Sequence, residues 1–123
     1  MSPHCRSRVL LVEDDAAIRE MTCDILKDDG FEVVPTADAE AALHRLQCDG
    51  PFDLLFSDIG LPGMNGRELA ERATTLDPAM PILLMTGYAG VAGARPTLCG
   101  VRLMLIHKPF TLQQLLRSVH ALL

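Results

Sequence analysis

The segment "LLFSDIGLPGMNG", residues 54–66, joins a short aliphatic run to a single carboxylate and a turn-forming loop. The apolar residues end at Asp58, and the loop that follows holds three glycines and a proline. A continuous apolar run of this length is typical of a strand buried on both faces of a parallel sheet. The segment therefore predicts a central strand that presents one acid at its carboxyl end. That acid could cap a helix, bind a metal ion or act as a nucleophile.

Similar aliphatic runs recur along the chain and alternate with segments of helical period. The five runs are residues 9–12, 31–34, 53–56, 81–85 and 103–106. Apolar residues at spacings of three and four predict helices that begin near residues 16, 39, 66 and 112. Asn65 with Glu68, and Thr111 with Gln114, have the spacing of capping boxes, and Gly30 stands where the first helix should end. The segment "YAGVAGARPTLCG", residues 88–100, is too rich in glycine and proline for a regular helix, so a short, frayed helix or a loop is expected there.

This alternation predicts an α/β fold, a single-domain (βα)₅ doubly wound parallel sheet of flavodoxin-like type. Polar residues follow every run except the second: Glu13 and Asp14, Asp58, Thr86 and Lys108. In the strand order 2-1-3-4-5 the second strand is an edge, and strands one and three meet at the switch point where ligands bind. We therefore expect the order 2-1-3-4-5, with the polar residues gathered at the carboxyl edge.

Composition limits the functions that the chain can have. The chain has 123 residues and a formal net charge of −5, and its basic residues are scattered, which argues against direct nucleic-acid binding. No apolar run reaches the ~20 residues of a membrane span, and the start lacks the apolar segment of a signal peptide, so a cytoplasmic protein without membrane contact is expected. The four cysteines and four histidines show no zinc-binding spacing.

The predicted carboxyl edge suggests phosphoryl chemistry. Two carboxylates about 5 Å apart repel by roughly 3 kcal/mol at an effective dielectric near 20, so Glu13, Asp14 and Asp58 should share a proton or bind a hard cation. Mg²⁺ is suitable because it takes one or two carboxylates together with waters and phosphate oxygens. Lys108 adds a positive charge and Thr86 a hydroxyl donor for a transferring phosphoryl group, and Asp58 would be the nucleophile.

The pieces "LLVEDD", "DLLFSDIGLPGMNG", "PILLMTG" and "HKPFT" resemble, in order and spacing, the receiver domain of response regulators, the CheY-like family. The resemblance covers residues 7 to 123, with residues 1–7 as an N-terminal extension and 8–123 as the receiver domain. It implies a two-component phosphorelay protein that accepts a phosphoryl group from a sensor histidine kinase or a histidine phosphotransfer protein. The wording of "TGYAG" and "KPFTLQQLL" resembles receivers attached to hybrid histidine kinases or single-domain regulators.

The resemblance also implies a role for each site residue. Asp58 would be the phosphoacceptor and Asp14 a direct Mg²⁺ ligand. Glu13 would be the second acid, often acting through water, and Gly60 would offer its backbone carbonyl to the metal. Thr86 would close on the phosphoryl group and Lys108 would pair with it. A cis bond before Pro109 is implied as well.

Two features depart from the family and two alternatives remain. Leu105 stands where the family usually has an aromatic switch residue, and residues 88–100 weaken the usual fourth helix, which makes Tyr88 a candidate cover for the site.

The first alternative is a Mg²⁺-dependent phosphohydrolase with an aspartyl-phosphate intermediate, disfavoured because Gly60 replaces the acid that such enzymes need two residues past the nucleophile. The second is a flavin-binding module, which lacks a hydroxyl-rich phosphate loop. As a receiver the protein would promote its own phosphorylation and dephosphorylation without a separate substrate, so it would not be an enzyme in the ordinary sense.

Overall fold

A computed structural model describes residues 7–61, 63–87, 103–108 and 110–123 of the chain. Five parallel strands form one sheet in the order β2-β1-β3-β4-β5, as the sequence predicts. The strands are β1 Arg8–Val12, β2 Glu32–Thr36, β3 Leu54–Asp58, β4 Ile82–Thr86 and β5 Leu103–His107. The described helices are α1 Ala16–Asp28, α2 Ala39–Cys48, α3 Gly66–Leu76 and α4 Leu112–Leu122.

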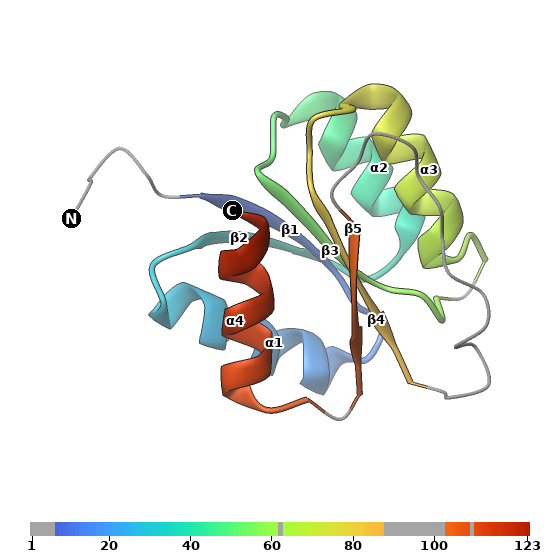
Figure 1. Cartoon of the computed structure of the whole chain (residues 1–123). Helices are drawn as coiled ribbons and strands as arrows, with labels where there is room; N and C mark the ends of the chain where they lie inside the picture. The colour runs from blue at the N-terminus through green and yellow to red at the C-terminus, as the bar shows by residue number, and fades with distance from the viewer. Residues whose placement is uncertain (1–6, 62, 88–102, 109) are drawn as a thin grey trace.

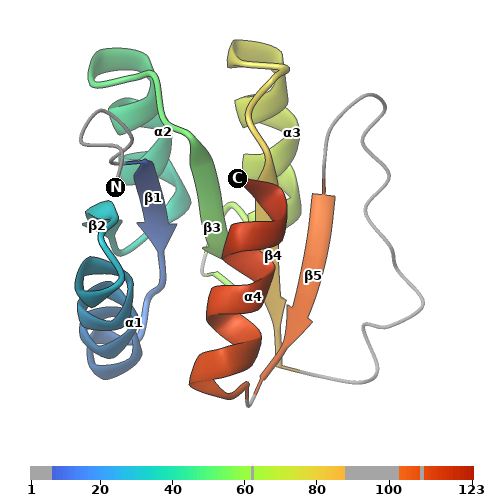
Figure 2. The same cartoon turned by 60° about the vertical axis from the view of Figure 1, so that its left-hand side comes forward.

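The helices form two layers, one on each face of the sheet (Figures 1 and 2). α1 and α4 cover one face, and α2 and α3 cover the other. Side chains on each strand alternate between the two layers, so every central strand is buried on both faces. The connection from β4 to β5, which includes the segment 88–100 and Tyr88, lies outside the described residues, as does the bond before Pro109.

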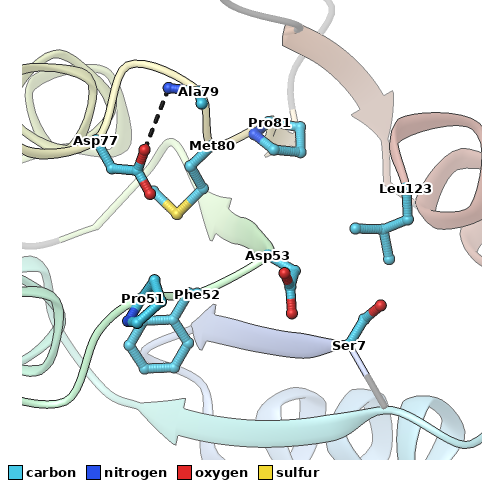
Figure 3. Close-up of a pocket in the computed structure, with 9 residues that line it drawn as sticks. All are labelled: Ser7, Pro51, Phe52, Asp53, Asp77, Ala79, Met80, Pro81 and Leu123. Carbon is cyan, nitrogen blue, oxygen red and sulfur yellow. Dashed lines mark hydrogen bonds between the residues drawn. The ribbon is translucent and has the colours of Figure 1, made fainter. Parts of the chain in front are cut away.

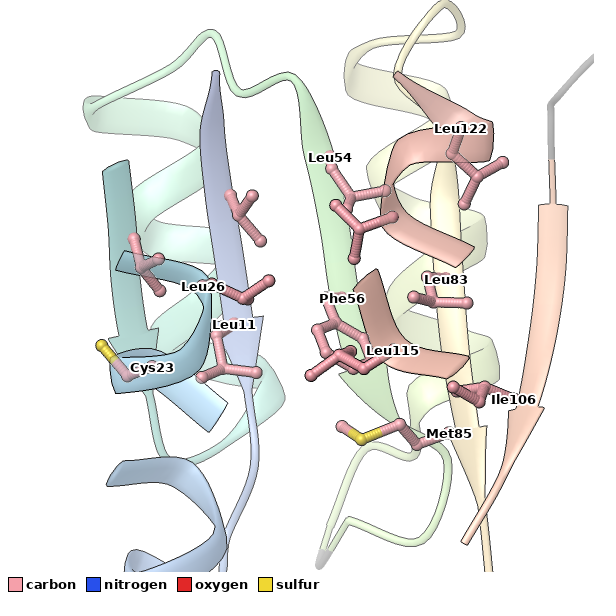
Figure 4. Close-up of a cluster of buried hydrophobic side chains, with 13 residues drawn as sticks. Leu11, Cys23, Leu26, Leu54, Phe56, Leu83, Met85, Ile106, Leu115 and Leu122 are labelled. Carbon is pink, nitrogen blue, oxygen red and sulfur yellow. The ribbon is translucent and has the colours of Figure 1, made fainter. Parts of the chain in front are cut away.

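Two aliphatic cores follow from this arrangement. The core beneath α1 and α4 contains Phe56 and Met85 from the strands and Leu115 from α4 (Figure 4). The core beneath α2 and α3 uses small residues, such as Ala42 and Ala73, where the helices lie close to the sheet. Leu105 packs against this second core and is half-buried.

The helix ends agree with the capping signals. Asp15 is the N-cap of α1 and accepts hydrogen bonds from the amides of Ala17 and Ile18. Asn65 caps α3 by accepting from the amides of Arg67 and Glu68, but the reciprocal Glu68 bond of a capping box is absent from the described residues. Thr111 and Gln114 form the complete capping box at the start of α4. Gly30 has a φ of +97° just past α1, a conformation that glycine adopts without steric cost.

Four of the five strands extend one or two residues past the carboxyl end of the apolar run that predicts them. β2 continues through Pro35 to Thr36, and β3 and β4 include the polar residues Asp58 and Thr86. The reason is that backbone pairing with the neighbouring strand continues whatever the side chain. Pro35 is tolerated because β2 is an edge strand, where one side of the backbone has no neighbour.

Candidate functional site

The register of the sheet places three predicted site residues on the same face. Val12 pairs with Ser57, Asp58 with Met85, and Thr86 with His107. Glu13 follows Val12, and Lys108 follows His107, so both lie at the same carboxyl edge as Asp58. Side-chain alternation directs Glu13, Asp58 and Lys108 toward the layer that contains α1 and α4.

Lys108 connects the two buried carboxylates of this edge. Its Nζ donates to Glu13 Oε1 at 2.9 Å and to Asp58 Oδ2 at 2.8 Å. Glu13 is 1% exposed and Asp58 is 8% exposed, so both carboxylates are largely removed from water. Because buried charges are tolerated when paired, the ammonium group accounts for their presence inside the protein.

Burial and pairing shift the protonation equilibria of this cluster. Desolvation raises the pKa of Glu13, although its hydrogen bonds to Lys108 and to the amide of Asp15 oppose the shift. For Lys108 desolvation lowers the pKa, but the hydrogen bonds and charges of Asp58 and Glu13 outweigh it, and the pKa is raised overall. The lysine is therefore a cation throughout the neutral range.

Asp14 differs from its two acidic neighbours because it is exposed. Glu13, Asp14 and Asp58 each bring a carboxylate oxygen to a common place, where these oxygens lie within 4.8 Å of one another. Oxygens on opposite sides of an octahedral Mg²⁺ are about 4.2 Å apart, twice the Mg–O distance. Carboxylate oxygens gathered this closely are the donors that Mg²⁺ prefers, and binding would draw them closer together.

Gly60 and Thr86, the remaining predicted site residues, lie close to Asp58 in the chain and in the sheet register, respectively. The amide of Gly60 donates to Asp58 Oδ1 at 3.0 Å. Thr86 is buried and lies one residue past Met85, the strand partner of Asp58. Its carbonyl accepts the amide of Lys108 at 2.8 Å, which links the ends of β4 and β5.

Gly66 is a site residue that sequence reasoning did not single out. A Cβ built at this position would lie 2.3 Å from the carbonyl oxygen of Asp58 and 2.8 Å from the Cα of Ile59. Contacts this short are forbidden, so only glycine allows the start of α3 to pack against the end of β3. The sequence shows a glycine at this position in "GMNG", but its close approach to Asp58 and Ile59 depends on how the loop between β3 and α3 folds back.

Comparison with known proteins identifies the family. The family model "response regulator receiver domain" matches residues 9–120. This chain is a member of the response regulator receiver domain family. It is 37% identical over 116 residues to the response regulator receiver protein CpdR of Brucella abortus, covering 94% of this chain and 96% of CpdR. It spans about a quarter of several other curated relatives.

Solved structures agree with this assignment. A CheY-like receiver domain protein from Methanospirillum hungatei matches with a TM-score of 0.85 at 36% identity, covering 94% of this chain and 91% of that one. TrrA from Thermotoga maritima, solved in complex with Mg²⁺-BeF, matches with a TM-score of 0.83 at 28% identity, covering 95% and 99%. The receiver domain is therefore a phosphoryl-accepting module of two-component signal transduction.

The opposite edge of the receiver's sheet holds a shallow cavity of about 440 Å³ (Figure 3). Ser7, Asp53 and Pro81 line it, and each stands directly before a strand. This cavity therefore lies a full strand length away from the carboxylates.

Among the described residues of the receiver, none of the helices has both the length and the apolar character of a membrane span.

Proposed function

We propose that Asp58 is the phosphoacceptor of this receiver and that its donor is a phosphohistidine of a sensor histidine kinase or a histidine phosphotransfer protein. The observation that supports this proposal most strongly is the position of Asp58. It is the one carboxylate that belongs to a central strand, and it contacts both Lys108 and the Gly60 amide.

In the proposed reaction a carboxylate oxygen of Asp58 attacks the phosphorus atom of the phosphohistidine. The new O–P bond gives an acyl phosphate as the P–N bond breaks, and the imidazole nitrogen keeps the bonding electron pair and takes up a proton. Each Asp58 oxygen accepts one hydrogen bond in the described residues and keeps a second lone-pair site. Lys108 stabilises negative charge on the phosphoryl oxygens, and the Thr86 hydroxyl donates to one of them.

The oxygen donors of this edge are those that Mg²⁺ prefers. We assign Asp14 and Asp58 as ligands, with the backbone carbonyl of Gly60 beside them and Glu13 as the second acid. Bound there, Mg²⁺ would neutralise charge that builds on the phosphoryl oxygens during transfer. Asp14 suits this role because its exposed carboxylate has no side-chain partner among the described residues, whereas both oxygens of Glu13 already accept hydrogen bonds.

The phosphohydrolase alternative is not favoured. The position two residues past Asp58 holds Gly60, whose amide donates to Asp58 Oδ1 and which has no acid to protonate a leaving group.

We propose that residues 8–123 form the receiver, preceded by a short extension of residues 1–7, in a cytoplasmic protein. It acts through contacts with other proteins, without direct nucleic-acid binding and without a separate substrate.

Intact-mass measurement after incubation with Mg²⁺ and acetyl phosphate tests this assignment. We expect one added phosphoryl group, its loss on treatment with hydroxylamine, which cleaves acyl phosphates, and no labelling of Asp58→Asn. The matched control is Asp53→Asn, the same substitution just before the same strand, which should label like the wild type. Undiminished labelling of Asp58→Asn would overturn the proposal.

A further inference from the structure

We propose that Arg19 is a positioning residue for the acidic pair: its guanidinium group holds the peptide that joins Glu13 to Asp14 and thereby sets the position of the Asp14 carboxylate. The inference rests on the proposed role of Asp14 as a Mg²⁺ ligand. Arg19 lies in the first half of α1 and is half-buried.

The contact that carries the proposal is a hydrogen bond from Arg19 Nη1 to the backbone carbonyl of Glu13, 2.8 Å long. This carbonyl belongs to the peptide group whose nitrogen is that of Asp14. Arg19 therefore restrains the peptide plane directly before Asp14. Since the plane can turn only if the bond breaks, the direction in which Asp14 leaves β1 depends on it.

Other bonds hold the rest of the turn between β1 and α1. The amide of Glu13 donates to the carbonyl of Thr36 at 3.1 Å, and the amide of Asp15 donates to Glu13 Oε2 at 3.1 Å. Both bonds involve the residues on either side of Asp14. Among the described residues, Arg19 provides the one side-chain donor to the backbone between them.

Asp14 needs this support more than its neighbours do. Glu13 is held through both carboxylate oxygens, and Asp58 through both of its own. The Asp14 side chain is exposed and has no side-chain partner in the described part of the chain. Before a cation arrives, the backbone is therefore the part of Asp14 that is restrained, and it sets the point from which the carboxylate extends. A ligand placed in advance costs less conformational entropy on binding.

Arginine suits the task for two reasons. Its long stem reaches from the second turn of the helix back to the end of the strand, and its charged donors make stronger hydrogen bonds than neutral ones. The substitution Arg19→Met retains a long apolar stem and removes every donor. Arg19→Lys keeps a charged donor and should restore the contact in part. Lys27→Met makes the same kind of change at an exposed position of the same helix and is the matched control.

The experiment measures the Mg²⁺ dissociation constant, the free energy of unfolding in EDTA, and amide hydrogen exchange of the metal-free protein. We expect Arg19→Met to raise the dissociation constant about tenfold, as loss of an outer-shell contact does. Arg19→Lys should recover most of the affinity, and Lys27→Met should bind like the wild type. Exchange in metal-free Arg19→Met should rise at the Asp15 amide, which donates to Glu13 Oε2, while the last two turns of α1 keep wild-type rates.

An unchanged dissociation constant in Arg19→Met would overturn the inference. So would exchange that rises evenly along α1 together with a lower free energy of unfolding, because Arg19 would then only stabilise the helix. If the wild type takes up no phosphoryl group and binds no Mg²⁺, the proposed function fails instead. The metal-free exchange of the Asp15 amide then still decides whether Arg19 holds this turn.

Discussion

Both ends of the parallel sheet hold a cation among oxygen atoms. They differ in whether every carboxylate near that cation has a hydrogen-bond partner. At the amino edge, Arg8 bonds to Glu32 at 2.9 Å and to the backbone carbonyls of Asp49 and Pro51. Its guanidinium lies 4.4 Å from the centre of the Phe52 ring, and its amide donates to Asp53. One forked cation thus links β1, β2 and the segment leading into β3.

At the carboxyl edge, a single ammonium group, that of Lys108, faces three carboxylates. It contacts Glu13 and Asp58, while Asp14 has no such partner among the residues that the structure describes. Arg19 adds a second positive charge, because its guanidinium bonds to the Glu13 carbonyl, so three negative groups and two positive ones leave a formal charge of −1 in a partly buried place. A lysine also offers a point charge where the arginine offers a planar fork.

The difference between the edges separates stability from function. At the amino edge Arg8 and both carboxylates beside it, Glu32 and Asp53, are hydrogen-bonded, which is what a stabilising network requires. The carboxyl edge keeps an excess of negative charge and an exposed ligand, and so it retains binding energy for a cation and a phosphoryl group. Substitutions at the amino edge should therefore change unfolding, and those at the carboxyl edge should change ligand response.

The largest expected effect tests the steric limit at the carboxyl edge. Gly66→Ala places a methyl group 2.3 Å from the carbonyl oxygen of Asp58, so we expect a loss of about 3 kcal/mol in the free energy of unfolding. The Cβ in Gly87→Ala would meet no atom of the described residues within 4 Å and should cost far less. Denaturant unfolding measures both, and equal losses would show that the contact at Gly66 relaxes.

The second effect tests the excess of negative charge. Mg²⁺ at 100 times its dissociation constant should add about 2.7 kcal/mol to the stability of the wild type by mass action. Asp14→Asn should lose most of this gain and should be slightly more stable than the wild type in EDTA, since one repelling charge is gone. Thermal melting with and without Mg²⁺ measures the shift. Asp53→Asn, at the amino edge, should keep the full shift; an equal shift in Asp14→Asn would count against direct ligation.

The third effect tests the hydrogen bonds of Arg8 at the amino edge. Arg8→Ala should lower the free energy of unfolding by about 1–2 kcal/mol, because several charged hydrogen bonds are lost but the pair with Glu32 is partly exposed. Mg²⁺ affinity should stay unchanged. Arg8→Lys keeps the charge without the fork and should recover less than half of the loss. Full recovery of the free energy of unfolding in Arg8→Lys would show that the positive charge alone provides the stabilisation and that the planar guanidinium group is not needed.

The smallest effect is a pH dependence of stability. Burial raises the folded-state pKa of Glu13 above its ordinary value near 4.5. The folded protein therefore binds this proton more tightly than the unfolded chain, and the resulting stabilisation is lost as pH rises from 4.5 through the raised pKa. Lys108 stays protonated across this window.

Glu13→Gln removes this titration, so its free energy of unfolding relative to the wild type should improve as the pH rises through the same window. Unfolding measured at closely spaced pH values checks the slope. Glu20→Gln, the same substitution at an exposed position of α1, controls for the chemical change itself. A difference between Glu13→Gln and the wild type that does not vary with pH would contradict the raised pKa.

Local patterns in the sequence determined the elements and the fold. Aliphatic runs, helical spacing and capping residues such as Asp15 and Thr111 act over a few residues, so they can be read from the chain directly. The absence of a polar residue after the second run predicted the strand order that the structure has. The same reasoning placed Glu13, Asp14, Asp58, Thr86 and Lys108 at one edge.

Tertiary structure alone decided which of these residues touch and what supports them. Glu13 and Lys108 are 95 residues apart in sequence, and their contact depends on the register of four strands. The need for glycine at position 66 and the bond from Arg19 to the turn before Asp14 likewise arise where the chain folds back on itself. Periodicity carries no information about such approaches, because they depend on distances between segments, and local spacing constrains only the segments themselves.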